Sequence, residues 1–363
     1  MKKVLFFASD YKIGLSTLLT DEALAFYHAG IDFVTVAGDS EQEEGLSDKI
    51  NELVSVYRID NLDEHHNFKS LAKDIAQIAK SNGTNVFHVQ NNWQLALSVY
   101  IKYVLLHNLN IKIVYTLHGF RHNHPLKSII ARILIGGLLF FFADQIICMS
   151  SYLKRKFALL SYKIVLIPLG IPDSFFTEKH EIDEGNGLQM VFPAQFRYGK
   201  NQNMIIRAFA KYIKKTGDTS SCLILPGSGD LQKEMISLAQ SLGISRHTLF
   251  PGQCSKDKIR QYYLQCNIGI VASNCETFGQ SIVEPFVLGR CVVTTPVGIA
   301  PDILKDGEGG LFFRNEDELT KIFERLHTSP SFITQCGKHN FERREQFRWA
   351  SIAKLYKNML SDL

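Results

Sequence analysis

Short apolar runs alternate along the chain with longer segments in which apolar residues recur at helical spacing. The runs predict buried strands and the longer segments predict helices, an alternation typical of parallel sheets covered on both faces. The predicted strands are residues 3–8, 32–37, 86–89, 112–117, 145–149, 164–167, 189–194, 221–225, 248–250, 268–272 and 291–294. The predicted helices are residues 16–29, 67–81, 93–107, 202–215, 230–242, 255–265 and 315–327.

The alternation breaks in a polar segment between residues 172 and 187. A chain of 363 residues suits two domains of ordinary size, so we place the domain boundary there. We expect an α/β protein with two Rossmann-like parallel-sheet domains that face each other across a cleft. The expected division is a first domain (1–170), a linker (171–187), a second domain (188–345) and a C-terminal helix (346–363).

Composition narrows the class of protein. A hydrophobic content of 45% and a charged content of 21% are typical of a globular protein, and a net charge of +4 is too small to indicate a nucleic-acid partner. The seven cysteines have neither metal-site nor disulfide spacing, which favours a reducing compartment. The longest apolar run, residues 133–143, is too short to span a membrane. We therefore expect a cytoplasmic location.

Two carboxylates, Glu276 and Glu284, stand eight residues apart around a segment that predicts a loop feeding a helix. Gly279 allows close approach of the backbone to a ligand, and Ser281 with Glu284 predicts a capping box at the start of the helix. Such a helix start favours a phosphate, while the carboxylates can accept hydrogen bonds from sugar or ribose hydroxyls. The alternative is that Glu284 only caps the helix and Glu276 is a solvated loop charge.

Further short motifs follow other predicted strands. They are Thr116-Leu117-His118-Gly119, Gly199-Lys200-Asn201, Leu225-Pro226-Gly227-Ser228-Gly229 and Leu249-Phe250-Pro251-Gly252. In this order and at these spacings the chain resembles glycosyltransferase family 4, the retaining enzymes of GT-B fold, along nearly its whole length, and we expect the bacterial polysaccharide or O-antigen type. The resemblance implies an acceptor-binding first domain, a nucleotide-sugar-binding second domain and a C-terminal helix that crosses back to the first domain.

The resemblance also implies roles for individual residues. It implies catalytic roles for His118, Glu276 and Lys200, with Lys200 neutralising the diphosphate and Glu284 binding the ribose. Either Gln195 or Arg197 takes the position at which the family carries an arginine. The donor-binding residues it implies are Gly14, Arg197, Lys200, Gly227, Pro251, Glu276, Phe278, Gly279, Gln280, Ser281 and Glu284.

The sequence contains no Asp-x-Asp motif, so we expect catalysis without a metal or other cofactor. Three histidines, His118, His122 and His124, have a spacing that could ligate zinc, but their loop supplies no acid or cysteine to complete the site. A purely structural role for His118 is the other alternative to a catalytic one.

Residues 125–143 are basic early and very apolar later, and Lys154, Arg155 and Lys156 follow. This pattern fits either a helix packed on the first sheet or a surface that meets an anionic bilayer. We expect a UDP-sugar donor, a polyprenyl-diphosphate-linked saccharide acceptor, and peripheral contact through residues 125–156 with the inner face of the cytoplasmic membrane.

Other functions remain open at this point. A nucleotide-sugar epimerase or a glycogen-synthase-like polymerase would share the fold, and an NAD-dependent oxidoreductase also has two parallel-sheet domains. The loop after the first strand, residues 9–14, lacks the Gly-x-Gly-x-x-Gly fingerprint of the oxidoreductase class. A catalytically silent sugar-binding module is the last alternative, and the presence of Glu276, Glu284 and Lys200 speaks against it.

Overall fold

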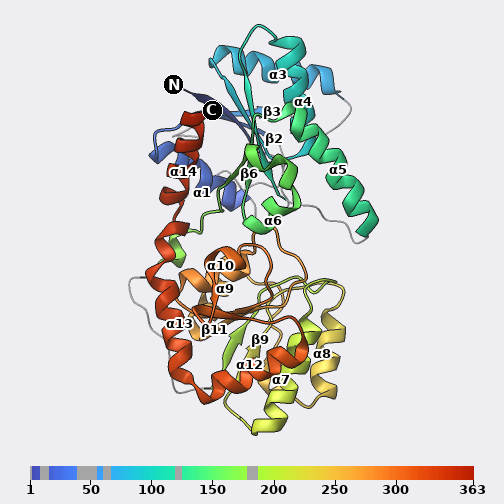
Figure 1. Ribbon diagram of the computed structural model, residues 1–363, viewed down its shortest axis with the longest axis vertical. Coiled ribbons are helices and arrows are strands. Elements are labelled where there is room, and N and C mark those ends of the chain that lie inside the picture. Colours follow the sequence, from blue (N-terminus) through green and yellow to red (C-terminus); the bar gives the residue numbers. More distant parts are fainter. Residues whose placement is uncertain (1, 9–15, 39–54, 60–66, 119–124, 178–186) are drawn as a thin grey trace. The chain divides into compact units, whose positions relative to one another are not determined.

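The computed structural model describes residues 2–8, 16–38, 55–59, 67–118, 125–177 and 187–363. The chain forms two compact units, residues 1–172 with 348–363, and residues 173–347. Within the described residues, each unit contains one parallel sheet of seven strands with helices packed around it (Figure 1). The predicted α/β class with two parallel-sheet domains is therefore confirmed. Gly14, His122, His124 and part of the expected linker (178–186) lie outside the described residues.

The sheet of the first unit has the strand order β3-β2-β1-β4-β5-β6-β7. The order reverses between β1 and β4, the kind of position at which ligands bind beyond the carboxyl ends of strands. Its strands are β1 (Lys3–Ala8), β2 (Asp32–Gly38), β3 (Val56–Ile59), β4 (Val86–Val89), β5 (Lys112–Leu117), β6 (Gln145–Cys148) and β7 (Ile164–Leu166).

Helices cover both faces of this sheet (Figure 1). Alternate residues of β1 serve the two faces: Leu5 and Phe7 enter one core cluster, and Val4 and Phe6 enter the other. The first cluster is covered by α3 (Phe68–Ser81), α4 (Asn92–Tyr100), the π-helical turn η2 (Ile101–Leu105), α5 (Pro125–Phe142), α6 (Ser151–Lys156) and the 3-10 helix η3 (Ala158–Lys163). The second is covered by α1 (Ser16–His28) and the C-terminal helix α14 (Trp349–Asp362).

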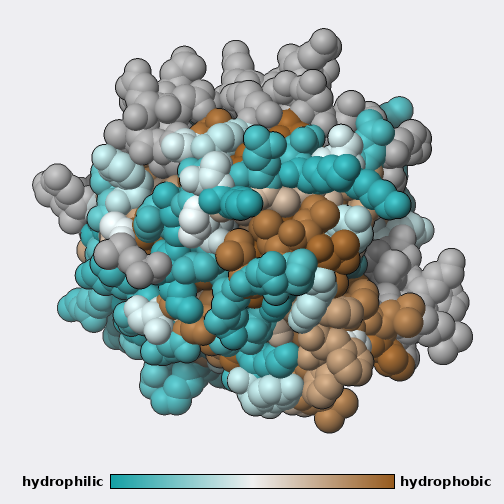
Figure 2. All heavy atoms as spheres, turned by 90° about the horizontal axis from the view of Figure 1, so that it is seen from above, coloured by the Kyte–Doolittle hydropathy of each residue, from teal (hydrophilic) through white to brown (hydrophobic). Residues whose placement is uncertain are grey.

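Helix α5 leaves apolar side chains in solvent. Leu139 is buried, whereas Ile133, Leu134, Leu138 and Phe141 are exposed. Apolar side chains gather at the right of Figure 2, the side on which Figure 1 draws α5. No helix of the described residues is long and apolar enough to cross a membrane.

The sheet of the second unit has the order β10-β9-β8-β11-β12-β14-β13, and its order reverses between β8 and β11. Figure 1 draws α9 and α10 on one side of this sheet and α7, α8 and α12 on the other. Its strands are β8 (Gln189–Val191), β9 (Cys222–Ile224), β10 (Thr248–Leu249), β11 (Ile268–Val271), β12 (Cys291–Thr294), β13 (Lys305–Asp306) and β14 (Gly309–Phe312). Its helices are α7 (Gln202–Thr216), α8 (Gln232–Ser241), α9 (Lys256–Gln265), α10 (Gln280–Val287), α11 (Ala300–Ile303), α12 (Glu316–Thr328) and α13 (Pro330–Glu342).

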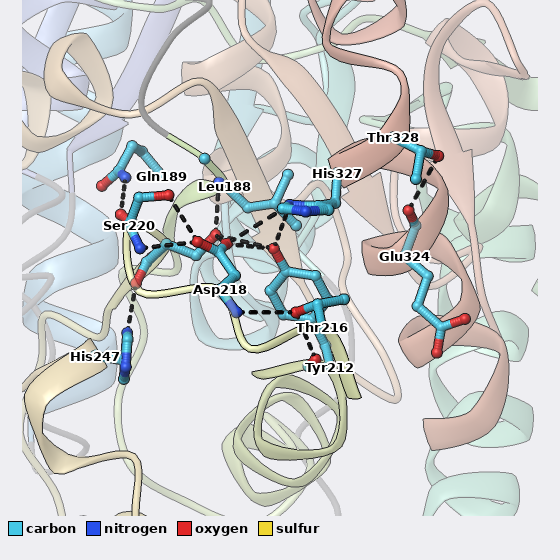
Figure 3. A network of polar contacts seen from close by, with 12 residues as sticks. Leu188, Gln189, Tyr212, Thr216, Asp218, Ser220, His247, Glu324, His327 and Thr328 are labelled. Carbon is cyan, nitrogen blue, oxygen red and sulfur yellow. Dashed lines mark hydrogen bonds and ion pairs between the residues drawn. The ribbon is translucent and has the colours of Figure 1, made fainter. Parts of the chain in front are cut away.

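Asp218 stands at the centre of a polar network at the amino ends of β8 and β9 (Figure 3). Its carboxylate accepts hydrogen bonds from the hydroxyls of Tyr212, at 2.5 Å, and of Ser221. Tyr212 also contacts His327 of α12, with 2.9 Å between its hydroxyl and Nδ1. Because ligands of parallel sheets bind at the carboxyl ends of strands, this network at the opposite edge stabilises the second unit rather than forming a site.

Candidate functional site

Two loops meet at the carboxyl ends of β8 and β11, where the strand order of the second sheet reverses. The Asn201 side chain donates a hydrogen bond to the carbonyl of Ala272 at 2.8 Å, and the Asn274 amide donates to the carbonyl of Gly199 at 2.8 Å. Asn201 has a left-handed backbone (φ 55°) at the start of α7, a conformation that asparagine tolerates better than most residues. These bonds fix the two loops to each other.

Lys200 and Glu276 come from these two loops and form an ion pair, with 2.5 Å between Nζ and Oε1. Both side chains are largely buried. The ammonium group has three donor hydrogens, so Lys200 can keep Glu276 as a partner and still donate to an incoming anion. The structure thus brings together two residues expected at the site that are far apart in sequence.

Helix α10 begins two residues earlier than the capping-box prediction required. Its N-cap is Gly279 at φ 94°, and no side chain caps it, so the prediction of Ser281 as N-cap is wrong. Only glycine adopts this conformation readily, and a Cβ there would lie 2.7 Å from Ile282 Cδ1. The amides of Gln280 and Ser281 belong to the first turn, where N–H groups point out of the amino end of a helix toward a ligand.

Pro285 lies inside α10, although proline cannot donate the usual helical hydrogen bond to the carbonyl four residues back. That carbonyl belongs to Ser281, and the Tyr263 hydroxyl donates to it at 3.4 Å. The ring of Pro285 packs on Gly269 of β11, where a Cβ would lie 2.4 Å away. A strand residue without a side chain therefore allows α10 to lie close to the sheet and fixes its amino end at the site.

Glu284 is 4% exposed, and its Oε1 lies 2.5 Å from Nζ of Lys256. Lys256 is the first residue of α9, whose N-cap is Ser255. Sequence reasoning missed Lys256 as a neighbour of the site. Ser255 signals the helix start in the sequence, but nothing in the spacing pairs Lys256 with a carboxylate 28 positions later. The carboxylate that was expected to complete a capping box instead has a cationic partner.

The glycine-rich turn after β9 lies against the loop after β10. The amide of Gly227 donates to the carbonyl of Gly252 at 2.7 Å, and the Ser228 hydroxyl donates to Gln253 Oε1 at 2.8 Å. Gly227 has φ 143°, and a Cβ there would lie 2.0 Å from the carbonyl oxygen of Ala194. Three loops, after β8, β9 and β10, are thereby held together, and Pro251 lies in the third.

The remaining expected donor residues divide between exposed and buried. Gln195 and Arg197 both have exposed side chains, while Phe196 between them is buried. Phe278 is buried, and its carbonyl accepts a hydrogen bond from the Ile299 amide at 2.8 Å. Phe278 thus supports the backbone that leads into Gly279.

His118 follows β5 in the first unit and is half-buried. Its Nε2 lies 2.6 Å from Oε1 of Gln90, and burial lowers its pKa to about 4. Behind it, Nε2 of His88 lies 2.7 Å from the Thr116 hydroxyl, and burial together with the nearby His118 lowers the pKa of His88 to about 3. Both imidazoles are neutral at physiological pH. A neutral His118 can exchange hydrogen bonds with hydroxyls but supplies no positive charge.

A metal site was considered for the loop that begins at His118, but His122 and His124 lie outside the described residues. Where the structure describes the chain, no group of three histidine, cysteine or acidic residues could hold a metal ion. The site of the second unit is thus described by its protein groups: the Lys200–Glu276 and Lys256–Glu284 ion pairs and the amino end of α10.

Two protein-family models match this chain. The model of the glycosyl transferases group 1 matches residues 174–343, and the model of Glycosyltransferase Family 4 matches residues 14–175. The chain belongs to the family 4 glycosyltransferases. The resemblance seen in its motifs is thereby confirmed, and the oxidoreductase alternative is excluded.

Two relatives are similar to this glycosyltransferase at low sequence identity. The alpha-monoglucosyldiacylglycerol synthase of Streptococcus pneumoniae is 24% identical over 87% of this chain and 77% of its own. A D-inositol 3-phosphate glycosyltransferase of Streptomyces bingchenggensis is 23% identical over 45% of this chain and 38% of its own. Among solved structures, Anabaena HepE in complex with UDP matches with a TM-score of 0.80 and 18% identity over the whole of both chains. This last similarity shows a shared fold.

Proposed function

We propose that this glycosyltransferase transfers a hexose from a UDP-sugar, with retention of the anomeric configuration. The observation that carries the proposal is the Lys200–Glu276 pair, 2.5 Å apart, beside the loop that begins α10. A cation and a helix amino end suit a diphosphate, and a carboxylate next to them suits sugar hydroxyls. The UDP bound in the Anabaena structure supports uracil as the base.

In the proposed donor complex, Lys200 and the first amides of α10 bind the diphosphate, with Arg197 as a further cation. Glu284 accepts hydrogen bonds from the ribose, and Glu276 binds hydroxyls of the transferred sugar. Gly227 and Pro251 contribute backbone to the nucleotide side. Gly14, in the first unit, is proposed to allow its loop to approach the phosphates. The assignment needs no divalent metal, since protein groups offset the diphosphate charge.

The chemical step breaks the bond between the anomeric carbon and the diphosphate oxygen and forms a bond from that carbon to an acceptor hydroxyl. The electron pair of the broken bond stays on the departing diphosphate. The acceptor proton passes to an oxygen of that diphosphate, so that attack and departure occur on the same face of the sugar. Lys200 stabilises the negative charge that develops there. A protein nucleophile is absent from this scheme, and trapping of a glycosylated Asp or Glu would overturn it.

His118 is proposed to contact the transferred sugar. Its low pKa keeps the imidazole neutral, which suits hydrogen bonding to a hydroxyl rather than charge stabilisation. Gln90, 2.6 Å away, orients the ring. His118→Ala should then lower kcat while UDP affinity stays unchanged.

The acceptor is proposed to be a polyprenyl-diphosphate-linked saccharide in the assembly of a bacterial surface polysaccharide such as O-antigen. An acceptor of this kind lies in the membrane, so we place the enzyme at the inner face of the cytoplasmic membrane, in peripheral contact through residues 125–156. The exposed apolar residues of α5 support this location. Peripheral attachment needs no membrane-spanning helix.

The first experiment is thermal stabilisation of the wild type and of Glu284→Ala by UDP, GDP, ADP and their sugars. Selective binding raises Tm by mass action. Stabilisation by UDP that falls strongly in Glu284→Ala supports the donor and ribose assignments, and the absence of stabilisation by any nucleotide refutes them. Turnover of UDP-sugars without any acceptor, yielding an epimer, would instead support an epimerase.

A further inference from the structure

Polar side chains are buried on the face of the first sheet that α1 and α14 cover. Figure 1 draws α14 (red) beside α1 (blue). Apolar residues of this face, such as Phe6 of β1 and Val86 of β4, pack in one cluster with both helices. The buried polar residues beside them are Glu22 of α1, His88 of β4, Thr116 of β5 and Tyr356 of α14. Burial of a polar group is costly unless it is hydrogen-bonded, so these side chains need partners.

The four polar side chains form one hydrogen-bonded chain. The hydroxyl of Tyr356 bonds to Glu22 and to the hydroxyl of Thr116. The Thr116 hydroxyl in turn lies 2.7 Å from Nε2 of His88. The rings of His88 and Tyr356 also pack together, with 5.7 Å between their centroids. The chain therefore connects α1 and α14 with two neighbouring strands, β4 and β5.

The number of available hydrogens fixes the direction of this chain. A carboxylate has none to donate, so Tyr356 donates its only hydroxyl hydrogen to Glu22. Toward Thr116 the tyrosine oxygen can then only accept, and Thr116 uses its own hydrogen there. Thr116 must therefore accept from His88, which places the proton of the neutral imidazole on Nε2. This direction holds while Glu22 is ionised, above the pKa of about 7 to which burial raises it.

A second pair of side chains lies at the carboxyl ends of the same two strands. Gln90 comes two residues after His88, and His118 comes two residues after Thr116, the spacing of one face of a strand. Nε2 of His118 lies 2.6 Å from Oε1 of Gln90, and an amide oxygen only accepts, so this imidazole also carries its proton on Nε2. The charged form of His118 would lower the pKa of His88, so the two pairs are neighbours.

We infer that Tyr356, acting through Thr116 and His88, is a positioning residue for His118. The chain gives His88 one tautomer and one orientation, and the ring of His88 lies behind the Gln90–His118 pair. A buried network in which every member is satisfied makes its members rigid, whereas apolar side chains would fill the same space without this constraint. The inference rests on the proposed function in that His118 is given the contact with the transferred sugar. The state of its imidazole can nevertheless be measured without substrate.

The test is nitrogen NMR of the imidazoles of His88 and His118 in the substrate-free full chain at pH 8, because nitrogen chemical shifts report the tautomer. The variants are Tyr356→Phe and Thr116→Val, each of which removes one hydroxyl, and Thr116→Ser, which retains it. Tyr356→Phe guards against misfolding, since it leaves the whole ring in place. The release of UDP from UDP-glucose, with water as the acceptor, is measured for each variant.

Tyr115→Phe is the matched control. Tyr115 precedes Thr116 on β5 and is also buried, but it belongs to the core cluster on the opposite face of the sheet. Its hydroxyl donates to Oδ1 of Asn92 at 2.9 Å. This variant therefore removes a buried tyrosine hydroxyl from the same strand without touching the chain.

We expect both imidazoles of the wild type to carry their proton on Nε2. In Tyr356→Phe the Thr116 hydrogen loses its acceptor and can turn to Nε2 of His88, so His88 should show a mixture of tautomers. The resonances of His118 should shift with it, and Thr116→Val should have a similar effect. Thr116→Ser and Tyr115→Phe should resemble the wild type. In Tyr356→Phe and Thr116→Val, kcat should fall about three- to tenfold, the usual worth of one hydrogen bond, while KM for UDP-glucose is unchanged.

Three outcomes would overturn the inference. They are a wild-type His88 with its proton on Nδ1, His118 resonances that stay unchanged in both Tyr356→Phe and Thr116→Val, and a Tyr115→Phe variant that shifts them equally. If the resonances respond as expected but UDP-glucose is not turned over by the wild type, the chain is supported and the result counts against the proposed donor alone.

Discussion

The ammonium group of Lys256 lies 2.5 Å from a carboxylate oxygen of Glu284, and this pair joins the first turn of α9 to α10. Glu284 is buried, whereas Lys256 is 44% exposed. A buried carboxylate without a partner is costly, so the lysine stabilises Glu284 and holds it in one orientation. The carboxylate proposed to bind the ribose is thus oriented before the donor arrives.

Lys256→Met is therefore expected to weaken UDP binding about tenfold, which corresponds to about 1.4 kcal/mol. The reason is that Glu284 loses the cation that orients it. The measurement is UDP affinity by isothermal titration calorimetry. Lys258→Met, two residues further along α9 at a lysine that contacts Gln261, is the matched control and should bind normally. Equal affinity of Lys256→Met and wild type would exclude this role.

Lys200→Met is expected to lower kcat by about 10²–10³-fold, because it removes the cation proposed to stabilise the departing diphosphate. The effect on the affinity for UMP should be small, since UMP lacks the distal phosphate. Steady-state kinetics with the UDP-sugar measure the first effect. The control is Lys211→Met, which removes an exposed lysine paired with Glu316 and Asp317. A wild-type kcat in Lys200→Met would contradict the proposed step.

Glu22 of α1 is buried in the first unit beside Tyr356 of α14. Burial raises the pKa of Glu22 to about 7, against a smaller lowering by a hydrogen bond from Tyr356. The folded state therefore holds a proton that the unfolded state loses near pH 4.5, so this contribution to stability is complete below pH 4.5 and is lost as pH rises through about 7. Relative to Glu22→Gln, the wild type should lose about 3 kcal/mol between these limits.

The measurement for Glu22→Gln is the free energy of unfolding in urea at pH 5 and at pH 8. The low pKa values of His88 and His118 destabilise the folded state as pH falls below 6.5, but they do so in both proteins and cancel in the difference. A difference that does not change with pH would show that Glu22 titrates normally.

Asp218→Asn is expected to destabilise the protein by about 2 kcal/mol, because the carboxylate accepts hydrogen bonds from Tyr212 and Ser221. Burial opposes ionisation of Asp218, but these bonds outweigh it and hold its pKa well below the usual range. The lowered pKa adds stability above about pH 4 that is lost as pH falls further, and the variant should lack this acid dependence. Thermal unfolding from pH 3 to pH 7 measures both effects.

UDP binding of Asp218→Asn should remain at the wild-type level, since the network lies at the amino ends of β8 and β9. The control is Asp317→Asn, where an exposed ion pair should contribute little to stability. An Asp218→Asn variant as stable as the control would mean that the network does not hold the second unit together.

His118 should titrate with a midpoint of about 4, because burial disfavours its charged form. Proton NMR of the imidazole, assigned with His118→Ala, measures the midpoint. The imidazole should then stay neutral between pH 6 and pH 8, and kcat/KM should show no ionisation of His118 in that range. A midpoint near 6.5 would show that solvent reaches the ring.

The sequence predicted the long amphipathic helices and the buried strands well, because periodicity reports burial directly. Strand β14 was missed: its residues, Gly309–Phe312, begin with two glycines that have low strand propensity. Gly310 is required there because a Cβ would lie 2.1 Å from the carbonyl oxygen of Val292 on β12. Close packing against β12 requires glycine at this position, and no local pattern in the sequence reveals that packing. Because glycine has a low strand propensity, the strand was not predicted.

At the site, the sequence predicted the features that a single segment forms. It did not predict the contacts between two segments. The sequence singled out Gly279 and predicted the start of α10 to within two residues. The pairing of Glu284 with Lys256 was not predicted, because it depends on how α9 packs beside α10. Lys200 and Glu276 were each singled out from the sequence, but only the structure shows that they are partners.

Helix α14 completes the core of the first unit from the far end of the chain, since Ile352 and Ala353 are fully buried against residues of β1 and α1. During synthesis on the ribosome, the first strand emerges long before its packing partner exists. One face of the first sheet remains partly uncovered until residues 348–363 have left the exit tunnel. Residues 173–347 form a continuous unit, which can fold earlier. Emergence of residues 348–363, rather than of the amino-terminal half of the chain, is then the event that completes the first unit.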